Sequence, residues 1–305
     1  MTVVSMRRPT IGVFDSGFGG LTVLKQLVHL IPNADYLYFG DTARLPYGSK
    51  STETVGRYAV QATHFLEQQR ANFIVIACNT ATALALPQIT VAASVPVVGV
   101  VEPGAQHAAQ QSRARKVVVI GTEATVASHA YRKALEERGI QAYEKACPLF
   151  VPLVEEGWID HPVTEEVARI YLKETFADGF ADADVLVLGC THYPLIQPLL
   201  ARVAPRTATI VDSAHSTAQF VSEQLPKPQG QTTNPLPISA PPGEPAAASF
   251  SMKTAAAIAA ANEVERRGPT RMRFFATDSV EKFRRMGPKF LGHPIKEVQH
   301  VDLKE

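Results

Sequence analysis

Two stretches of the chain share one pattern, an apolar run that ends in a cysteine followed by small polar residues. They read FIVIACNT over residues 73–80 and VLVLGCTH over residues 185–192. Short continuous apolar runs are typical of strands that are buried inside a parallel sheet. The repetition therefore predicts two similar α/β halves, in which Cys78 and Cys190 directly follow corresponding strands.

Further apolar runs extend this pattern outward along the 305-residue chain, in alternation with segments rich in helix-forming residues. The run at 11–14, followed by Asp15 and Ser16, has a counterpart at 117–120, followed by Gly121 and Thr122. This alternation predicts an α/β fold of two similar doubly wound parallel-sheet domains that face each other across a cleft. We predict strands at 11–14, 36–39, 73–77, 97–101, 117–120, 185–188, 209–211 and 272–276, and helices that include 52–69, 164–176, 251–266 and 279–286.

Two segments outside the repeats carry their own signals. Residues 226–248 are rich in Pro, Gly, Ala and Gln, which predicts a linker or insertion with no core of its own. Asp278 precedes the last predicted helix and is a candidate for its N-cap.

The composition excludes several classes of protein. A net charge of +1 gives no electrostatic footprint for nucleic acid or for an anionic membrane surface. Three cysteines supply neither a disulfide framework nor the close pairs of a zinc site, which favours a reducing cytoplasm and no bound metal. Arg7-Arg8 suggests an export signal, but Asp15 interrupts the apolar run that follows, so we expect none.

Residues 71–101 carry no charged side chain and are long enough to span a bilayer. Pro87 and Pro96 interrupt this stretch, and its pattern is that of a strand, a helix and a second strand. We therefore predict a buried β-α-β unit and no membrane span.

The setting of the two cysteines favours reactive thiols. Ligands bind at the carboxyl ends of strands in open α/β sheets, and a helix N-terminus lowers the pKa of a thiol from about 8.5. A single cysteine in such a place can equally be a small apolar residue of the core, and this is how we interpret Cys147. Two thiols at matching places suit the inversion of a stereocentre, which needs one base on each face of the carbon. Asp15 and His192 are candidates for tuning them, with an optimum near or slightly above neutral pH.

The glycine-rich turn DSGFGG at residues 15–20 has two interpretations. A dinucleotide-binding motif needs a third glycine where Thr22 stands, so that signal is weak, although Asp41 ends the second predicted strand. The alternative is an anion site, in which bare backbone N–H groups hold a carboxylate. Tyr47 and Gly48 lie in a second turn that is either a ligand contact or an ordinary surface turn.

In six segments the chain resembles the glutamate racemases of bacterial cell-wall synthesis, a branch of the aspartate/glutamate racemase family. These segments are GVFDSGFGGLTVL (12–24), YFGDTARLPYGSKS (38–51), IACNTATA (76–83), VVGVVEPG (97–104), PLFVPLVEEG (148–157) and LGCTHYPLI (188–196). Together they cover most of residues 11 to 212. The stretch 226–248 looks longer than that family needs.

The resemblance implies a cofactor-independent interconversion of L- and D-glutamate, without pyridoxal phosphate or metal, that supplies D-glutamate for peptidoglycan. It implies a discontinuous first domain, 1–102 plus 212–305, and a second domain, 103–211, with the site between them. The bases would be Cys78 and Cys190, assisted by Asp15, His192 and an acidic residue at 155 or 156, with Glu155 favoured. The implied substrate contacts are Asp15, Ser16, Tyr47, Gly48, Asn79, Thr80, Thr191 and His192.

Two rival functions remain open at this point. A nucleotide-dependent oxidoreductase would use the glycine-rich turn for its cofactor, and a non-catalytic binding protein would use the same cleft for an amino acid. The sequence also leaves open whether the chain is a monomer or a homodimer, and whether cell-wall precursors regulate it.

Overall fold

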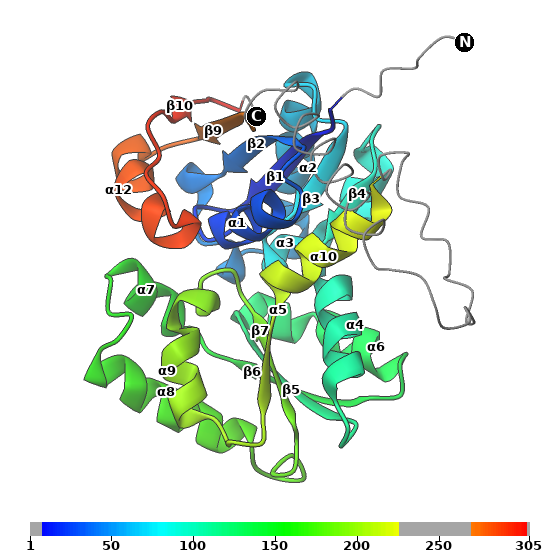
Figure 1. The fold of residues 1–305 in the computed structure, drawn as a ribbon, viewed down its shortest axis with the longest axis vertical. Helices are drawn as coiled ribbons and strands as arrows, with labels where there is room; N and C mark the ends of the chain where they lie inside the picture. Colours follow the sequence, from blue (N-terminus) through cyan, green and yellow to red (C-terminus); the bar gives the residue numbers. More distant parts are fainter. Residues whose placement is uncertain (1–7, 226–269, 304–305) are drawn as a thin grey trace, which may run out of the picture.

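The computed structural model describes residues 8–225 and 270–303, and its strands form two separate sheets (Figure 1). The strand order is β10-β9-β2-β1-β3-β4 in the first sheet and β6-β5-β7-β8 in the second. Every strand pairing is parallel. The strands are β1 (Thr10–Asp15), β2 (Asp35–Gly40), β3 (Phe73–Ile76), β4 (Val97–Gly99), β5 (Lys116–Gly121), β6 (Gln141–Ala146), β7 (Val185–Gly189), β8 (Thr209–Asp212), β9 (Met272–Ala276) and β10 (Gln299–His300).

The two sheets share one internal order, and this confirms the predicted pair of similar α/β halves. In the first half the strands run β2-β1-β3-β4, and in the second β6-β5-β7-β8. The registers agree as well, since Phe14 of β1 pairs with Ile76 of β3 and Ile120 of β5 pairs with Leu188 of β7. The first half alone adds β9 and β10 from the C-terminal segment. The domain boundaries at 102/103 and 211/212 stay a prediction.

Helices cover both faces of each sheet, as a doubly wound fold requires. On β1 the side chains of Ile11 and Val13 enter one apolar core, while Phe14 enters a second core on the other face. Helix α10 crosses between the halves and packs on both α1 and α4 (Figure 1). The helices are α1 (Leu21–Leu30), α2 (Thr52–Gln68), α3 (Asn79–Ala92), α4 (Val101–Gln111), α5 (Glu123–Ala127), α6 (Ala130–Glu136), α7 (Phe150–Glu155), α8 (Pro162–Thr175), α9 (Gln197–Val203), α10 (Ser213–Gln224) and α12 (Val280–Leu291), with 3-10 turns η1 (Thr42–Arg44), η2 (Tyr47–Ser49) and η3 (Tyr193–Ile196).

The last helix differs from the prediction at both ends. Its N-cap is Ser279, in the left-handed region at φ 52°, so the prediction of Asp278 as the cap is wrong. The helix continues past residue 286 because Met286, Phe290 and Leu291 extend its buried face. It ends at Gly292, whose φ of 90° suits glycine.

The remaining elements differ little from the prediction. The strand predicted at 97–101 ends at Gly99, because Val101 already begins α4. Strands β6 and β10 were not predicted. Both are edge strands that lack a continuous apolar run: β6 is only partly buried, and β10 is exposed. The predicted segments at 226–248 and 251–266 lie outside the described residues.

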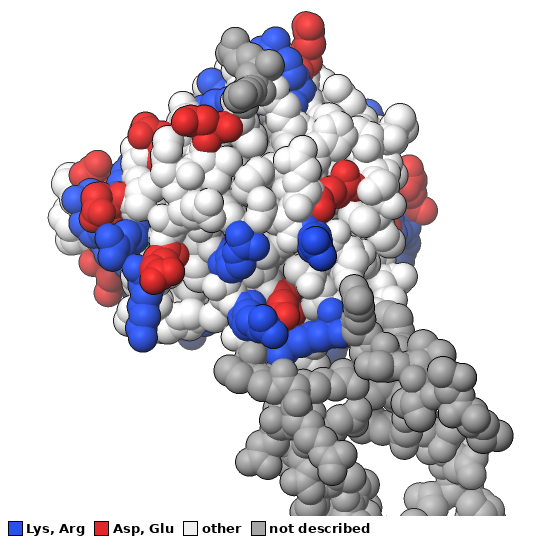
Figure 2. All heavy atoms as spheres, turned by 90° about the horizontal axis from the view of Figure 1, so that it is seen from above, with Lys and Arg blue, Asp and Glu red and all other residues white. Residues whose placement is uncertain are grey.

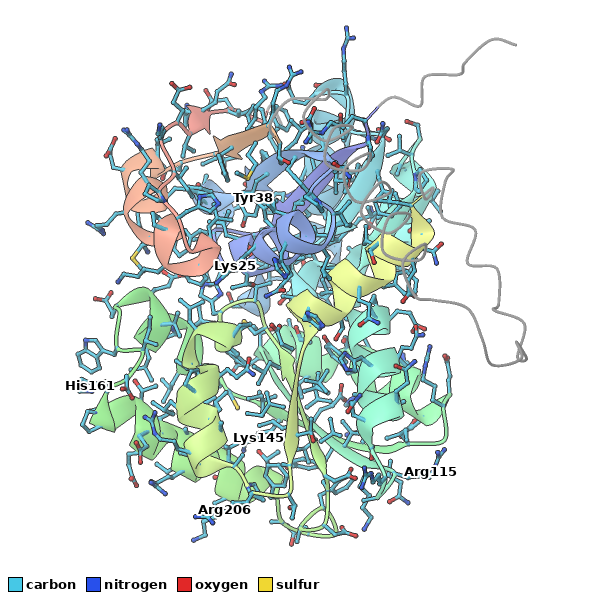
Figure 3. All side chains as sticks on the ribbon, viewed as in Figure 1. Lys25, Tyr38, Arg115, Lys145, His161 and Arg206 are labelled. Atoms are coloured by element: carbon cyan, nitrogen blue, oxygen red, sulfur yellow. The ribbon has the colours of Figure 1, made fainter. Side chains whose placement is uncertain are left out.

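The uncharged stretch at 71–101 folds as the predicted β-α-β unit of β3, α3 and β4, with Pro87 inside α3. Within the described part of the chain, no helix combines the length and the apolar character that crossing a membrane would need. The face seen from above carries Lys and Arg together with Asp and Glu, separated by broad uncharged areas (Figure 2). Charged residues such as Arg115 and Arg206 project from the periphery, whereas Tyr38 lies inside the first half (Figure 3).

Candidate active site

Cys78 lies where β3 gives way to α3. It is the N-cap of α3, and its Sγ accepts the N–H of Ala81 at 3.4 Å. Its thiol donates to the hydroxyl of Ser16, which follows β1, at 3.5 Å. The side chain is 5% exposed. The first thiol therefore lies at the carboxyl edge of the first sheet, where ligands of such sheets bind.

Cys190 occupies the matching place in the second half, directly after β7, and is 6% exposed. Its Sγ lies 4.0 Å from Nδ1 of His192. The segment that follows begins as the 3-10 turn η3 and becomes α-helical only at Gln197. An α-helix N-terminus thus adjoins only the first of the two thiols.

Asp15 ends β1 at the same edge, and the turn after it holds its carboxylate. Oδ2 accepts the Gly17 N–H at 2.9 Å, and Oδ1 accepts the hydroxyl of Thr191 at 3.5 Å. Asp15 is 1% exposed, and Thr191 belongs to the other half. The Gly17 N–H of this glycine-rich turn is therefore taken by the protein's own carboxylate, and a ligand carboxylate at the turn stays a prediction.

Gly19 and Thr22 join this turn to the second half. The hydroxyl of Thr22 donates to the carbonyl of Gly19 at 3.0 Å and to that of Thr191 at 3.2 Å. A Cβ added at Gly19 would lie 2.4 Å from Oγ1 of Thr191 and 2.6 Å from Nδ1 of His192. Thr22, which stands where a dinucleotide motif has its third glycine, thus contacts the other half of the protein.

The contact at Gly19 leads to a first prediction. Gly19→Val is expected to push the Thr191 and His192 loop away from Asp15 and to lower kcat/KM by about tenfold or more, with little loss of fold. Steady-state kinetics and thermal unfolding check this. Gly179→Asn is the control, because nothing lies within 4 Å of a Cβ there and Asn tolerates its left-handed backbone. Kinetics like those of the parent in Gly19→Val would contradict the prediction.

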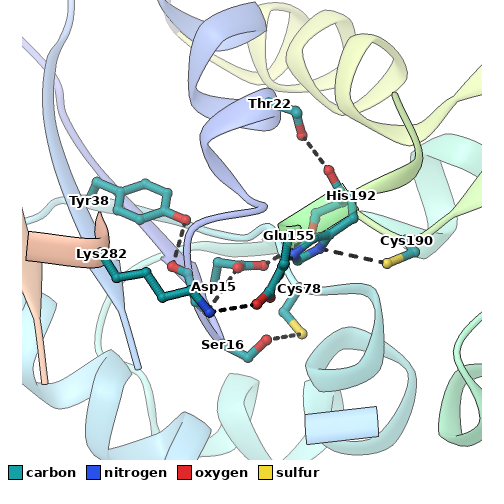
Figure 4. A network of polar contacts seen from close by, with 11 residues as sticks. Asp15, Ser16, Thr22, Tyr38, Cys78, Glu155, Cys190, His192 and Lys282 are labelled. Atoms are coloured by element: carbon teal, nitrogen blue, oxygen red, sulfur yellow. Dashed lines mark hydrogen bonds and ion pairs between the residues drawn. The ribbon is translucent and has the colours of Figure 1, made fainter. Parts of the chain in front are cut away.

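The buried His192 and the partly buried Glu155 form an acid/base pair beside Cys190 (Figure 4). Nε2 of His192 lies 3.3 Å from Oε1 of Glu155, an ion-pair distance without hydrogen-bond alignment. Oε2 of the same carboxylate accepts from Nζ of Lys282 at 2.8 Å. The neighbouring Glu156 is exposed and makes no polar side-chain contact among the described residues. Of the two glutamates, the structure thus places Glu155 at the site.

The electrostatics of Cys78 differ from the prediction. Burial, reinforced by the charge of Asp15, raises the pKa of the Cys78 thiol to about 12, although the N–H of Ala81 and the hydroxyl of Ser16 act in the opposite direction. The expectation of a lowered pKa at this helix N-terminus is therefore wrong. Burial also raises the pKa of Asp15, against the opposing charge of His192 and the N–H of Gly17.

His192 lies in the opposite electrostatic setting. Burial alone would lower its pKa, but the Cys190 thiolate and the Glu155 carboxylate outweigh burial and raise the pKa to about 10. For Glu155, burial is outweighed by His192 and Lys282, so the pKa is lowered. One thiol therefore lies near a carboxyl group that can take up a proton, and the other beside an imidazolium that can give one.

Comparison with known proteins bears on this arrangement of two thiols. The Asp/Glu/Hydantoin racemase family matches residues 11–221, more than half of the chain. The chain belongs to this family of racemases. This racemase is an isomerase that acts on an amino acid, so the oxidoreductase and the non-catalytic binding protein are set aside.

The similarity extends over nearly the whole racemase. The glutamate racemase of Koribacter versatilis is 58% identical over 300 residues, which are 98% of this chain and 99% of that protein. The crystal structure of glutamate racemase from Francisella tularensis in complex with D-glutamate has a TM-score of 0.77 at 32% identity, covering 97% of this chain and 98% of that one. The glutamate racemase of Thermus thermophilus, in complex with β-chloro-D-alanine, has a TM-score of 0.75 at 42% identity, with the same coverage.

The predicted substrate contacts of the racemase cluster around the two thiols. Asn79 is 2% exposed, its Oδ1 accepts from the Tyr131 hydroxyl at 2.7 Å, and its Nδ2 is buried without a partner among the described residues. The hydroxyl of Thr80 lies 2.9 Å from that of Thr122. Asn79 therefore offers an amide donor that a ligand could satisfy.

In the turn that contains Tyr47 and Gly48, the tyrosine side chain is buried and hydrogen-bonded within the protein. Tyr47 is 1% exposed, and its hydroxyl donates to Oδ2 of Asp41 at 2.5 Å. A Cβ at Gly48 would lie 3.1 Å from Cβ of Thr122 in the other half. Only the backbone of Tyr47 and Gly48 is thus left to meet a ligand.

Sequence reasoning missed several residues that shape the site of the racemase. Thr122 and Thr125 meet Thr80 from the second half, much as Thr191 meets Asp15. The signal for Thr122 was present, because it is the counterpart of Ser16 in the repeat. Tyr131 had no sequence signal. Among residues 8–225 and 270–303, no group of three or more His, Cys, Asp or Glu side chains is arranged to hold a metal ion.

Proposed function

We propose that this racemase interconverts L- and D-glutamate by proton transfer to and from two thiols, Cys78 and Cys190. One observation carries the proposal: the thiols occupy matching places in two similar halves, with the Asp15 carboxyl group near Cys78 and the His192 imidazole beside Cys190. Glutamate as the substrate is supported by relatives that are glutamate racemases, one of them with D-glutamate bound. The same resemblance supports a cytoplasmic enzyme that provides D-glutamate for peptidoglycan.

Conversion of L-glutamate begins at Cys190. The thiolate of Cys190, whose Sγ lies 4.0 Å from Nδ1 of His192, takes the α-proton, and the electron pair of the broken C–H bond is delocalised into the α-carboxylate. The thiol of Cys78 then delivers a proton to the opposite face, so that one C–H bond is broken and one is formed. Cys190 is left protonated and Cys78 ionised. The high pKa of Cys78 suits it to remain a thiol until this step.

Conversion of D-glutamate reverses these roles. Asp15 accepts the proton of Cys78, which its raised pKa favours, and the Cys78 thiolate takes the α-proton. His192, which Glu155 holds in the charged form, first gives its proton to Cys190, and the Cys190 thiol then delivers this proton to the other face and is left ionised. Asp15 thus acts as the base for one thiol, and His192 acts as the acid for the other.

Hydrogen bonds would hold the substrate between the thiols. The unpartnered amide of Asn79 is suited to the α-carboxylate, where it would stabilise the charge that develops on proton removal. The hydroxyls of Ser16, Thr80 and Thr191 and the backbone of Tyr47 and Gly48 supply the remaining contacts. No step needs an electron sink beyond the substrate carboxylate, so we propose that neither metal nor pyridoxal phosphate takes part.

The direct test is racemisation by the purified protein without added cofactor. We expect interconversion of L- and D-glutamate, followed by circular dichroism, that survives exhaustive chelation and carbonyl-trapping reagents. Aspartate, tested under the same conditions, should react far more slowly. Loss of activity to a carbonyl reagent with recovery on adding pyridoxal phosphate would contradict the mechanism, and preference for aspartate would contradict the substrate.

The pH dependence gives a second prediction. The reaction needs one ionised and one protonated thiol, so kcat/KM should rise and fall as a bell whose limbs belong to the coupled pair. His192 keeps its proton up to about pH 10, and Cys78 to about 12, so the alkaline limb should lie at about pH 10 or above. This places the optimum on the alkaline side of the near-neutral value that free thiols suggest. A profile that falls already between pH 7 and 8 would contradict these assignments.

A further inference from the structure

Lys282 connects the first half of the protein to the acid/base pair of the second. It lies on the first turn of α12, a helix of the C-terminal segment that packs on α1. Its Nζ is 2.8 Å from Oε2 of Glu155, which ends α7 in the other half. The same Nζ lies 5.4 Å from the ring centroid of Phe18, in the glycine-rich turn. The ion pair therefore spans the two halves next to the thiols (Figure 4).

The carboxylate of Glu155 divides its two oxygens between two partners. Oε2 contacts Lys282, while Oε1 lies 3.3 Å from Nε2 of His192, whose other ring nitrogen lies 4.0 Å from Sγ of Cys190. A carboxylate fixed at one oxygen presents the other in a defined direction. The orientation of Glu155 toward His192 thus depends on Lys282.

Helix α12 also supports the imidazole itself. The ring of Phe290 packs edge-on against His192 with centroids 5.3 Å apart, and the ring of Phe18 lies 6.1 Å away. Lys282 and Phe290, two turns apart on one helix, therefore contact the two members of the pair. The side chains of Glu155 and His192 are 17% and 8% exposed, so water competes little with these contacts.

We propose that Lys282 is a positioning residue for the Cys190 base: from the first half of the protein it orients Glu155 against His192. The inference rests on the proposed two-thiol function and adds to it a residue from outside the six sequence motifs at residues 12–196. Lys282 acts through Glu155, without contact to the substrate.

The charges around His192 define a readout that a merely structural role would not change. Cys190, Glu155 and Asp15 face His192 as anions when ionised, and Lys282 is the cation that faces Glu155. Lys282→Met removes a cation, which by itself would raise the pKa of His192. If Lys282 orients Glu155, its loss also lets the carboxylate turn away from the imidazolium, which lowers that pKa. The inference therefore predicts that the pKa of His192, and with it the alkaline limb of activity, falls by about half a pH unit.

The test compares Lys282→Met with Lys282→Arg and with the control Arg285→Met. Arg285 lies on the same helix, is exposed, and makes no polar side-chain contact among the described residues. We expect Lys282→Met to lower kcat about tenfold in both directions with little change in KM. Lys282→Arg should restore most of the activity, and Arg285→Met should behave like the parent. In a Glu155→Gln background, Lys282→Met should add almost nothing.

Three outcomes would overturn the inference: parental kcat in Lys282→Met, an equal loss in Arg285→Met, or full additivity with Glu155→Gln. Titration of the His192 ring by NMR in the substrate-free protein gives a readout that needs no activity. A fall in its pKa in Lys282→Met alone supports the inference even if the parent does not racemise glutamate, which would overturn the proposed function instead. An unchanged or raised pKa overturns the inference whatever the substrate.

Discussion

Cys78→Ser and Cys190→Ser are each expected to lose racemisation of both enantiomers by about a thousandfold or more. A serine hydroxyl is a far weaker acid than a thiol, so it is not ionised and cannot serve as the base. Its pKa also lies far above that of the remaining cysteine, so it does not replace the thiol as the proton donor. Because the enantiomers have equal free energies, kcat/KM must fall equally in both directions. Polarimetry or circular dichroism on purified variants measures this loss.

Cys147→Ser is the matched control for the two catalytic variants. Cys147 is fully buried in the apolar core, and its thiol donates to the carbonyl of Lys145 at 3.7 Å. The serine variant should lose stability while keeping parental kcat, because Cys147 has no place in the proposed proton path. Near-parental rates in Cys78→Ser or Cys190→Ser would remove that thiol from the mechanism.

Asp15→Asn is expected to lower kcat/KM by about a hundredfold or more. The amide keeps the size of the side chain but cannot take the proton of Cys78, whose pKa is raised to about 12. At the same time, loss of the Asp15 charge removes one cause of that raised pKa. If the charge of Asp15 served only to keep Cys78 protonated, Asn would not impair catalysis, so the sign of the effect separates the two roles.

The control for this variant is Asp212→Asn, at the carboxyl end of β8. Asp212 caps α10 by accepting the Ala214 N–H at 2.8 Å, and Asn is an equally good N-cap. The expected result is parental activity in Asp212→Asn and strong loss in Asp15→Asn. Equal activity in both would show that Asp15 is architectural.

Local patterns explain how much of the site was predictable. Apolar runs mark parallel strands whatever surrounds them, and the residue after each run lies at the carboxyl edge of the sheet. Cys78, Cys190 and Asp15 could be brought together on that ground alone, before any partner was known. The sequence repeat also places the two cysteines at corresponding positions in the two halves, which predicts that both belong to one site.

What the sequence missed depends on contacts between distant segments. The pKa of Cys78 could not be predicted because burial, reinforced by the charge of Asp15 from another segment, outweighs the local effect of the helix N-terminus. Glu155 and Glu156 are adjacent, and only the direction of α7 decides which of them meets His192. Lys282 reaches the site from α12, more than a hundred residues away along the chain. β6 was not predicted because it is an edge strand, and an edge strand does not need the continuous apolar run by which the other strands were identified.

The central claim is that the two thiols act on opposite faces of one carbon, and a substrate analogue with a β-leaving group tests it most directly. Removal of its α-proton leads to irreversible elimination, so each thiol can be observed without the other. The resemblance assigns L-glutamate to Cys190 and D-glutamate to Cys78. We therefore expect Cys78→Ser to eliminate from the L-enantiomer only, and Cys190→Ser from the D-enantiomer only. Elimination from both enantiomers at parental rates by either variant would contradict the two-base account.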